Sequence, residues 1–244
     1  MQVSGAVTII TGGSAGIGLA TARLFAAQGA RVALASRSAQ TLKTLAGELP
    51  DSFAIPTDMR DGASIKQMVE AVHRHYGRID LLINNAGQAL YSPVEQVNLD
   101  DYRQIMELNV YGPLLAMQAV IPAMREQGGG MILNISSNVS KMYIPGLAAY
   151  ASTKYALNAL TLTARAELAN DNIRVSVMHP GLTATDFGRN AISSQGRNPS
   201  GGPAGPRRPG MPTPDSPENV AAKILEAVQT EAAETSMHNL PPQA

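Results

Sequence analysis

Short apolar segments alternate with helix-like segments along most of the chain, and this alternation constrains the fold more than any other feature. Apolar runs occupy residues 6–10, 30–36, 53–57, 79–83, 131–136 and 173–178. Helical periodicity fills the intervals at 19–27, 38–49, 61–76, 100–127 and 147–169. Pro113 and Pro122 predict kinks or a break in the fourth of these helices. We expect an α/β fold: a doubly wound parallel sheet of six to seven strands with helices on both faces.

The C-terminal part departs from this alternation. Glycine and proline make up nearly half of residues 193–217, which excludes a helix or a central strand. We expect a mobile loop there, either a lid over a site or a disordered insertion. A helix is expected at 217–229, followed by a short edge strand at 235–238. Nothing indicates a second domain, so residues 1–244 are expected to form one.

The composition excludes several functional classes. Charged residues make up 16% of the 244 residues and the formal net charge is zero, so there is no electrostatic footprint for nucleic acid or an anionic membrane. The chain has no cysteine, and its four histidines are not grouped with carboxylates at ligand spacing, so no disulfide and no metal site is expected. No apolar run approaches the ~20 residues of a membrane span, and no signal segment precedes the first strand, so a cytoplasmic protein is expected.

The turn between the first expected strand and helix, residues 11–18, is rich in glycine. Gly12, Gly16 and Gly18 have the spacing G-x-x-x-G-x-G. Glycine tolerates a positive φ and lets a phosphate approach the backbone, and the helix start that follows offers unpaired N–H groups and a positive dipole end. The turn is therefore a candidate pyrophosphate site. A tight turn without a ligand is the alternative, and the spacing alone leaves both open.

Tyr150 and Lys154 lie four residues apart on an expected helix, so their side chains share one face. A phenol has a reference pKa of about 10 and is a poor acid or base at neutral pH. A neighbouring ammonium favours the phenolate and moves that pKa toward the working range. The pair is thus a candidate for proton exchange, although an ordinary exposed pair has the same spacing.

Further polar stretches follow the expected strands in order. They are Asn-Asn-Ala-Gly at 84–87, Asn109 in the long helix, Ser137 thirteen residues before Tyr150, and residues 180–185 after the sixth strand. Together with the glycine turn and the phenol–ammonium pair, this ordered set resembles the short-chain dehydrogenase/reductase family over residues 5 to about 187. The resemblance implies a single Rossmann-type domain that interconverts a carbonyl and an alcohol with a nicotinamide cofactor.

The resemblance implies four catalytic residues. Tyr150 would exchange the proton with the substrate oxygen, and Ser137 would donate a hydrogen bond to that oxygen. Lys154 would bind the nicotinamide ribose and lower the pKa of Tyr150. Asn109 would hold a water behind Lys154 for proton relay. The two hydroxyl groups would thus stand where negative charge develops.

The resemblance also implies a set of cofactor contacts. Gly12, Ser14, Gly16, Ile17 and Gly18 would surround the pyrophosphate, Asp58 and Met59 would face the adenine ring, and Asn85, Ala86 and Gly87 would shape the floor near the adenosine ribose. Tyr150, Lys154, Pro180, Gly181, Leu182, Thr183 and Thr185 would line the nicotinamide end, where the Leu182 backbone and the two threonines fix the carboxamide.

The end of the second strand bears on the choice of nicotinamide cofactor. An acid there would bind the ribose 2′-hydroxyl, but the chain has Ser36 followed by Arg37. A guanidinium bonds a 2′-phosphate that a carboxylate would repel, so NADP(H) is expected over NAD(H). Ala15 stands where some family members place a second basic contact, which favours a moderate preference. A solvated loop charge is the alternative for Arg37.

The substrate is expected to be a small, apolar carbonyl or alcohol. The residues that would surround it are mainly apolar: Leu90, Val139, Met142, Tyr143, Ile144 and Phe187. Core packing is the alternative for Val139 and Ile144. His179, just before Pro180, either reaches this pocket or has a structural role, which we favour.

The resemblance also bears on assembly and on competing functions. A homodimer through the helices at 100–127 and 147–169, or a homotetramer, is expected. The Val-Asp-Gly-Gly segment that many family tetramers use is absent, which puts the tetramer in doubt. The alternative functions are a catalytically silent nucleotide sensor or scaffold and a sugar-nucleotide epimerase or dehydratase, which usually has a larger C-terminal region.

Overall fold

The chain folds into alternating strands and helices. The computed structural model describes residues 1–193 and 213–238. Its strands are β1 (Val7–Thr11), β2 (Arg31–Ser36), β3 (Ser52–Pro56), β4 (Leu81–Asn84), β5 (Leu90–Tyr91), β6 (Gly130–Ile135), β7 (Ile173–His179), β8 (Ile192–Ser193) and β9 (Glu234–Ser236). Its α-helices are α1 (Gly16–Ala27), α2 (Ala39–Glu48), α3 (Gly62–Tyr76), α4 (Leu99–Met106), α5 (Gly112–Glu126), α6 (Ala148–Glu167) and α7 (Pro217–Thr230). Short helical segments are η1 (Val94–Gln96), η2 (Glu107–Tyr111), η3 (Asn138–Lys141) and η4 (Ala169–Asp171).

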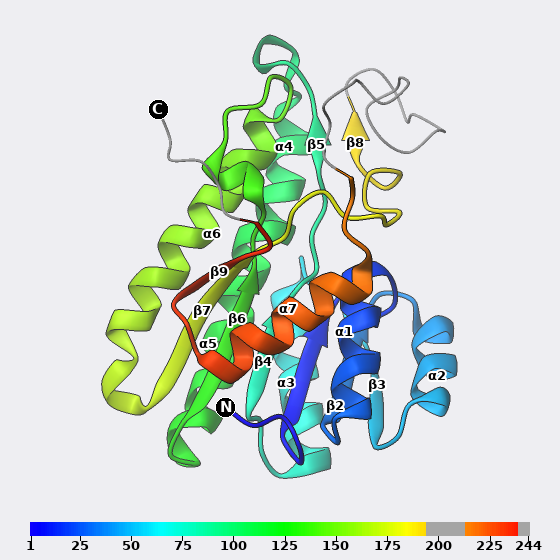
Figure 1. Cartoon of the computed structure of the whole chain (residues 1–244), viewed down its shortest axis with the longest axis vertical. Coiled ribbons are helices and arrows are strands. Elements are labelled where there is room, and N and C mark those ends of the chain that lie inside the picture. Colours follow the sequence, from blue (N-terminus) through cyan, green and yellow to red (C-terminus); the bar gives the residue numbers. More distant parts are fainter. Residues whose placement is uncertain (194–212, 239–244) are drawn as a thin grey trace.

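Seven parallel strands form one sheet at the centre of the molecule (Figure 1). Their order is β3-β2-β1-β4-β6-β7-β9, and every neighbouring pair is parallel. The direction of progression reverses between β1 and β4. Open parallel sheets bind ligands at such a switch point, outside the carboxyl ends of the strands.

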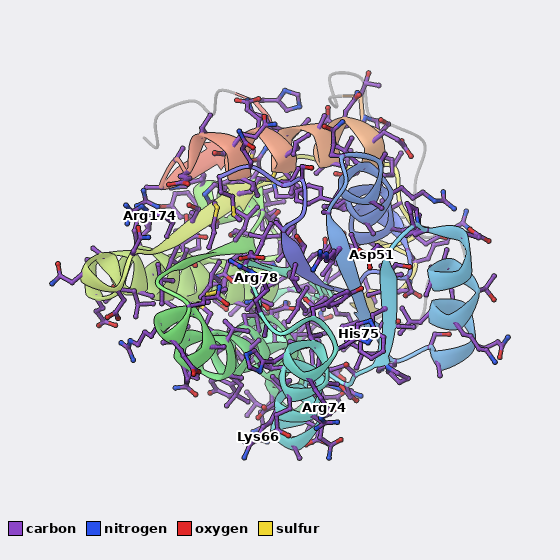
Figure 2. The ribbon with its side chains drawn as sticks, turned by 90° about the horizontal axis from the view of Figure 1, so that it is seen from below. Asp51, Lys66, Arg74, His75, Arg78 and Arg174 are labelled. Carbon is purple, nitrogen blue, oxygen red and sulfur yellow. The ribbon has the colours of Figure 1, made fainter. Side chains whose placement is uncertain are left out.

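Helices cover both faces of the sheet, which confirms the predicted fold class. Ile10 of β1 packs into an apolar cluster with α1, α2 and α7, whereas its neighbour Ile9 packs into a second cluster with α3 and α5. Figure 2, seen from below, shows α1 and α7 on one side of the sheet and α3 and α5 on the other. All five residues of β1 are buried, as expected for a strand that is covered by helices on both faces.

Helix ends match their sequence signals where the signals are strong. The Asp61 side chain accepts a hydrogen bond from the first turn of α3, and Gly77 ends that helix with a φ of 77°. At α7, Ser216 accepts a hydrogen bond from Asn219 N, and Pro217 occupies the first helical position. These caps fix the lengths of the two helices.

The helix predicted at 100–127 is interrupted, and only Pro113 lies at the break. The π-helical segment η2 separates α4 from α5, and the Gly112 amide donates to the carbonyl of Glu107, five residues back. Pro113 has no N–H to continue the ordinary pattern, so the wider turn absorbs the defect. Pro122 lies inside α5. The interruption places Asn109 in the interior, where it has no exposed surface.

Two short strand pairings complete the fold. The predicted edge strand is β9, which pairs with β7 at residues 234–236 rather than 235–238. A two-stranded ribbon, β5 with β8, was not predicted, because strands of two residues have no readable periodicity. The loop predicted at 193–217 lies largely outside the described residues. Within the described part of the chain, no helix has both the length and the apolarity needed to cross a membrane.

Candidate active site

The sheet brings the predicted site residues to one edge. The glycine turn follows β1, residues 84–87 end and follow β4, Ser137 follows β6, and residues 180–185 follow β7. These four strands are neighbours in the sheet and are parallel, so their carboxyl ends meet. Tyr150 and Lys154 come from the start of α6, which packs beside β7.

Hydrogen bonds from the end of β4 fix the glycine turn. Asn85 Nδ2 donates to Thr11 O (2.9 Å) and lies 3.4 Å from Gly12 O. Thr11 Oγ1 accepts from the amides of Asn85 (3.0 Å) and Ala86 (3.1 Å). The sequence predicts Asn85 at the ribose floor and gives no signal for Thr11. In the structure both residues hold the backbone of the turn.

The turn has the shape of a phosphate cradle. Gly12 and Gly16 have φ values of 67° and 52°, a region that disfavours side chains. A methyl group at Gly18 would collide with the carbonyl of Gly12, and one at Gly16 would lie 3.1 Å from Thr185 Cγ2. The first turn of α1 has no acidic residue and no side-chain cap, so its N–H groups are available to an anion. These features fit a pyrophosphate.

Tyr150 and Lys154 are not an exposed surface pair. Their side chains are 6% and 4% exposed. Lys154 Nζ donates to the carbonyl of Ile135 at 3.0 Å and lies 5.9 Å from the centre of the Tyr150 ring. Burial lowers the pKa of Lys154 to about 8. The core of α6 therefore holds an ammonium beside a phenol, at the carboxyl edge of the sheet.

The pKa of Tyr150 is shifted in the direction opposite to the prediction. Burial raises this pKa well above its usual value, a hydrogen bond with Ser137 lowers it, and the nearby Tyr91 raises it further. Lys154 is not among the groups that shift this pKa in the protein alone, and its Nζ donates to the carbonyl of Ile135. Tyr150 is thus a protonated donor in contact with the Ser137 hydroxyl.

Asn109 stands behind the lysine, at the break between α4 and α5. Its Nδ2 donates to Gln88 O (2.9 Å) and to Thr153 Oγ1 (3.1 Å), and its Oδ1 accepts from the Gln88 amide (2.9 Å). A methyl group at Gly87 would lie 3.2 Å from Asn109 Oδ1 and 3.6 Å from Lys154 Nζ. Because Gly87 has no side chain, the amide oxygen and the ammonium face a common space.

The residues predicted to contact the adenosine end of the cofactor have different hydrogen-bond partners. Ser36 Oγ lies 3.4 Å from the Ser38 amide, and Arg37 is exposed. Both oxygens of Asp58 bond Arg60, the shortest contact being 2.8 Å. The bond to Arg60, aided by the charge of Arg37, holds the pKa of Asp58 below its usual value.

The assignment of Met59 to the adenine ring is wrong for its side chain. Met59 is 4% exposed and packs into the apolar cluster under α3 and α5. Burying the apolar thioether side chain in that cluster stabilises the fold more than leaving it at an exposed edge would.

A second segment clamps the loop after β7. Thr183 forms a bridge with Asp215, whose amide donates to Leu182 O (2.8 Å) and whose carbonyl accepts from the Ala184 amide (2.9 Å). Asp215 Oδ2 also lies 3.0 Å from His238 Nε2. Sequence reasoning missed Asp215, which lies in the glycine- and proline-rich region and has no motif of its own.

Apolar side chains pack against Tyr150. The Phe187 ring lies 6.0 Å from the Tyr150 ring, and Tyr91 and Val139 pack against the same small cluster. Met142, Tyr143, Ile144, Leu182 and Phe187 are between 38% and 79% exposed. Leu90, which was expected here, is 1% exposed and belongs to a core cluster with α4 and α6, so that assignment is wrong.

Comparison with known proteins identifies the family. The short chain dehydrogenase family model matches residues 6–196. Dehydrogenase/reductase SDR family member 7B of Mus musculus is 34% identical over 199 residues, which are 78% of this chain and 62% of that protein. A 3alpha-hydroxysteroid dehydrogenase of Mediterraneibacter gnavus is 36% identical over 194 residues, 77% of each chain. The chain thus spans less than two thirds of the mouse relative.

Solved structures agree with the sequence relatives. A 3-ketoacyl-(acyl-carrier-protein) reductase of Brucella melitensis, complexed with NADH, has a TM-score of 0.83 at 27% identity and 96% coverage of both chains. A short chain dehydrogenase of Burkholderia cenocepacia, in complex with NADP, has a TM-score of 0.82 at 27% identity, covering 98% of this chain and 90% of that one. The protein therefore belongs to the short-chain dehydrogenase/reductase family.

Proposed function

We propose that the protein is an NADP(H)-dependent oxidoreductase that interconverts a carbonyl and an alcohol. One observation carries the proposal: a buried phenol lies against a serine hydroxyl and beside a buried ammonium, at the sheet edge that also holds the glycine cradle. A sensor or scaffold of the same fold would gain nothing from burying Lys154, because a buried ammonium destabilises the folded chain.

The chain's own residues supply the proton and the charge stabilisation. In reduction, Ser137 and Tyr150 donate hydrogen bonds to the carbonyl oxygen, and Tyr150 transfers its proton as that oxygen becomes an alkoxide. Lys154 stabilises the phenolate that remains, and Asn109 holds the water through which the proton is restored. The nicotinamide, when bound, supplies the hydride. The glycine turn and residues 180–185 would hold the cofactor's pyrophosphate and its nicotinamide end.

Steady-state turnover tests the proposal. NADPH oxidation is followed with a panel of carbonyl compounds, and NADPH affinity is measured by fluorescence titration. Tyr150→Phe removes the proton donor, so turnover should fall by about 10²–10⁴-fold while the dissociation constant for NADPH changes little. Equal turnover in both proteins would remove Tyr150 as the acid. Tight NADPH binding with no turnover by the wild type would favour the sensor.

The preference for NADP(H) rests on Arg37 and on the absence of an acid at Ser36. Arg37 is exposed at the end of β2, and structural neighbours bind either NADH or NADP, so the family leaves the choice open. Charge-assisted bonds to a 2′-phosphate contribute ~1.5–3 kcal/mol. Arg37→Ala should therefore lower the NADPH-to-NADH ratio of kcat/KM by about 10- to 150-fold. Arg23→Ala, an exposed arginine of α1, is the matched control, and an unchanged ratio in Arg37→Ala refutes this assignment.

The substrate class and the assembly follow from exposed apolar residues. The apolar side chains beside Tyr150, Phe187 among them, favour an apolar or aromatic carbonyl, in line with a relative that is named for a hydroxysteroid. Large apolar side chains on α4, η2, α5 and α6 are also exposed: Leu99, Tyr111, Leu115, Tyr155 and Leu162. Such a surface favours a homodimer through these helices. Sedimentation equilibrium of the protein should give twice the monomer mass, and a monomer at all concentrations contradicts the dimer.

A further inference from the structure

A buried histidine contacts the backbone of the serine that faces Tyr150. His179, the last residue of β7, has no exposed surface. Its Nδ1 lies 3.4 Å from the carbonyl of Ser137 and 3.3 Å from the hydroxyl of Ser140. The Ser140 hydroxyl itself donates to the Ser137 carbonyl at 2.7 Å. Two groups therefore converge on one carbonyl, directly beside the side chain that contacts Tyr150.

Both ring nitrogens of His179 lie beside oxygen atoms. The Ser140 hydroxyl donates a hydrogen bond to the Ser137 carbonyl and accepts one from Asn158 Nδ2 at 2.9 Å. His179 Nδ1 thus lies beside the Ser137 carbonyl and the Ser140 hydroxyl, while Nε2 lies beside the Glu234 carboxylate. Burial lowers the pKa of His179 more than Glu234 raises it. The ring therefore lies between Glu234 and the turn that holds Ser137.

Glu234 contacts both this histidine and the opposite end of the short helix η3. Its Oε1 lies 3.0 Å from His179 Nε2 and 2.6 Å from Lys141 Nζ. Burial acts to raise the pKa of Glu234, but the bond and charge of Lys141, together with His179, bring it below its usual value. Lys141 is the last residue of η3, and Ser137 is the residue just before η3. One carboxylate on the edge strand β9 therefore braces both ends of η3.

We infer that Glu234 and His179 are positioning residues for Ser137: they hold η3 so that the serine hydroxyl stays directed at Tyr150. This inference rests on the proposed function, since Ser137 matters to catalysis only if Tyr150 is the proton donor. Neither residue contacts the Tyr150 hydroxyl. Their effect passes through the Ser137 carbonyl and through the two ends of the turn. A small displacement of a reacting group has a large kinetic cost, so roughly a ten-fold loss of kcat is expected when the brace is broken.

Two readouts test the inference on the whole protein. Glu234→Gln removes the charge at nearly constant size, on a side chain that is partly exposed, so the fold should be retained. Hydrogen exchange of the peptide covering residues 137–142 should become about ten-fold faster, because the ion pair to Lys141 is lost. The KM for NADPH should stay constant while kcat falls. Glu231→Gln, in the same C-terminal segment but paired with Arg174, is the matched control and should change neither quantity.

A double-mutant cycle separates this inference from the proposed function. If Glu234 acts through Ser137, the effect of Glu234→Gln on kcat should disappear in a Ser137→Ala background. Equal losses in both backgrounds, or unchanged exchange at residues 137–142, overturn the inference. Full activity in Ser137→Ala, with faster exchange in Glu234→Gln, refutes the catalytic serine and leaves the bracing of η3 standing. His179→Asn adds a second variant, whose exchange should rise in the same peptide.

Discussion

Lys154 should destabilise the folded protein at neutral pH. Its pKa falls from 10.5 to about 8 on burial, which corresponds to roughly 3 kcal/mol. Below pH 8 the residue is charged in both the folded and the unfolded chain, so the whole cost is present. Between pH 8 and 10.5 the folded chain has lost a proton that the unfolded chain keeps. Stability from this residue therefore rises with pH across that window.

The substitution Lys154→Met removes this cost. It also leaves the carbonyl of Ile135 without its donor, a loss of ~1–3 kcal/mol that does not depend on pH. At pH 7 the variant should therefore be between about equally stable and ~2 kcal/mol more stable than the wild type, while turnover is lost. At pH 9.5 the free energy of unfolding of the variant, relative to the wild type, should be about 2 kcal/mol lower than at pH 7. The reason is that the wild-type lysine is then largely neutral in the folded chain.

Urea unfolding followed by circular dichroism, at pH 7 and at pH 9.5, measures this difference. Other groups that titrate in this range are common to both proteins and cancel in the comparison. Lys66→Met, on the exposed face of α3, is the matched control, and its difference from the wild type should be the same at both pH values. If the difference between wild type and Lys154→Met is also independent of pH, the lysine is not buried as an ammonium, and the reasoning fails.

The remaining predictions concern backbone space and one buried carboxylate. Gly18→Ala should abolish NADPH binding and reduce the free energy of unfolding by ~1–3 kcal/mol, because its methyl group would collide with the carbonyl of Gly12. The control Gly47→Ala, in open space on α2, should instead raise the free energy of unfolding by ~0.5 kcal/mol. Asp80→Ala should cost about 2 kcal/mol in urea unfolding, since the carboxylate accepts the first amide of β1, whereas Glu70→Ala on the surface should cost under ~0.5 kcal/mol. Gly87→Ala should lower kcat at least about ten-fold, because its methyl group fills the space between the catalytic amide and ammonium. Equal kcat in that variant and the wild type would remove the proton relay through this space.

The parts of the fold that depend on local pattern could be predicted from the sequence. The strand β1, the glycine turn and α1 follow one another as apolar run, flexible turn and helical period, and the structure has them in that form. The caps of α3 and α7 are local signals for the same reason. Parallel order then brings the ends of β1, β4, β6 and β7 together, so the place of the site follows from the pattern of elements.

Features that depend on contacts between distant residues could not be predicted. Sequence position places Met59 beside the expected adenine site but does not say that its side chain turns into the core under α3 and α5. The direction of the Tyr150 pKa depends on how completely α6 buries the ring, which spacing alone does not give. His179 and Glu234 are far apart in the chain and meet only because β9 pairs with β7. Prolines indicated a break between 100 and 127 but not that a π-helical turn would bury Asn109.

The most direct test of the central claim follows the atoms of a single turnover. NADPH deuterated at C4 of the nicotinamide is mixed with an active carbonyl compound, and mass spectrometry measures the deuterium on the carbinol carbon of the product. Transfer by the wild-type protein is expected, and in Tyr150→Phe with bound cofactor it should be slower by about 10²–10⁴-fold. Transfer at the wild-type rate in Tyr150→Phe would contradict the claim that this buried phenol delivers the proton.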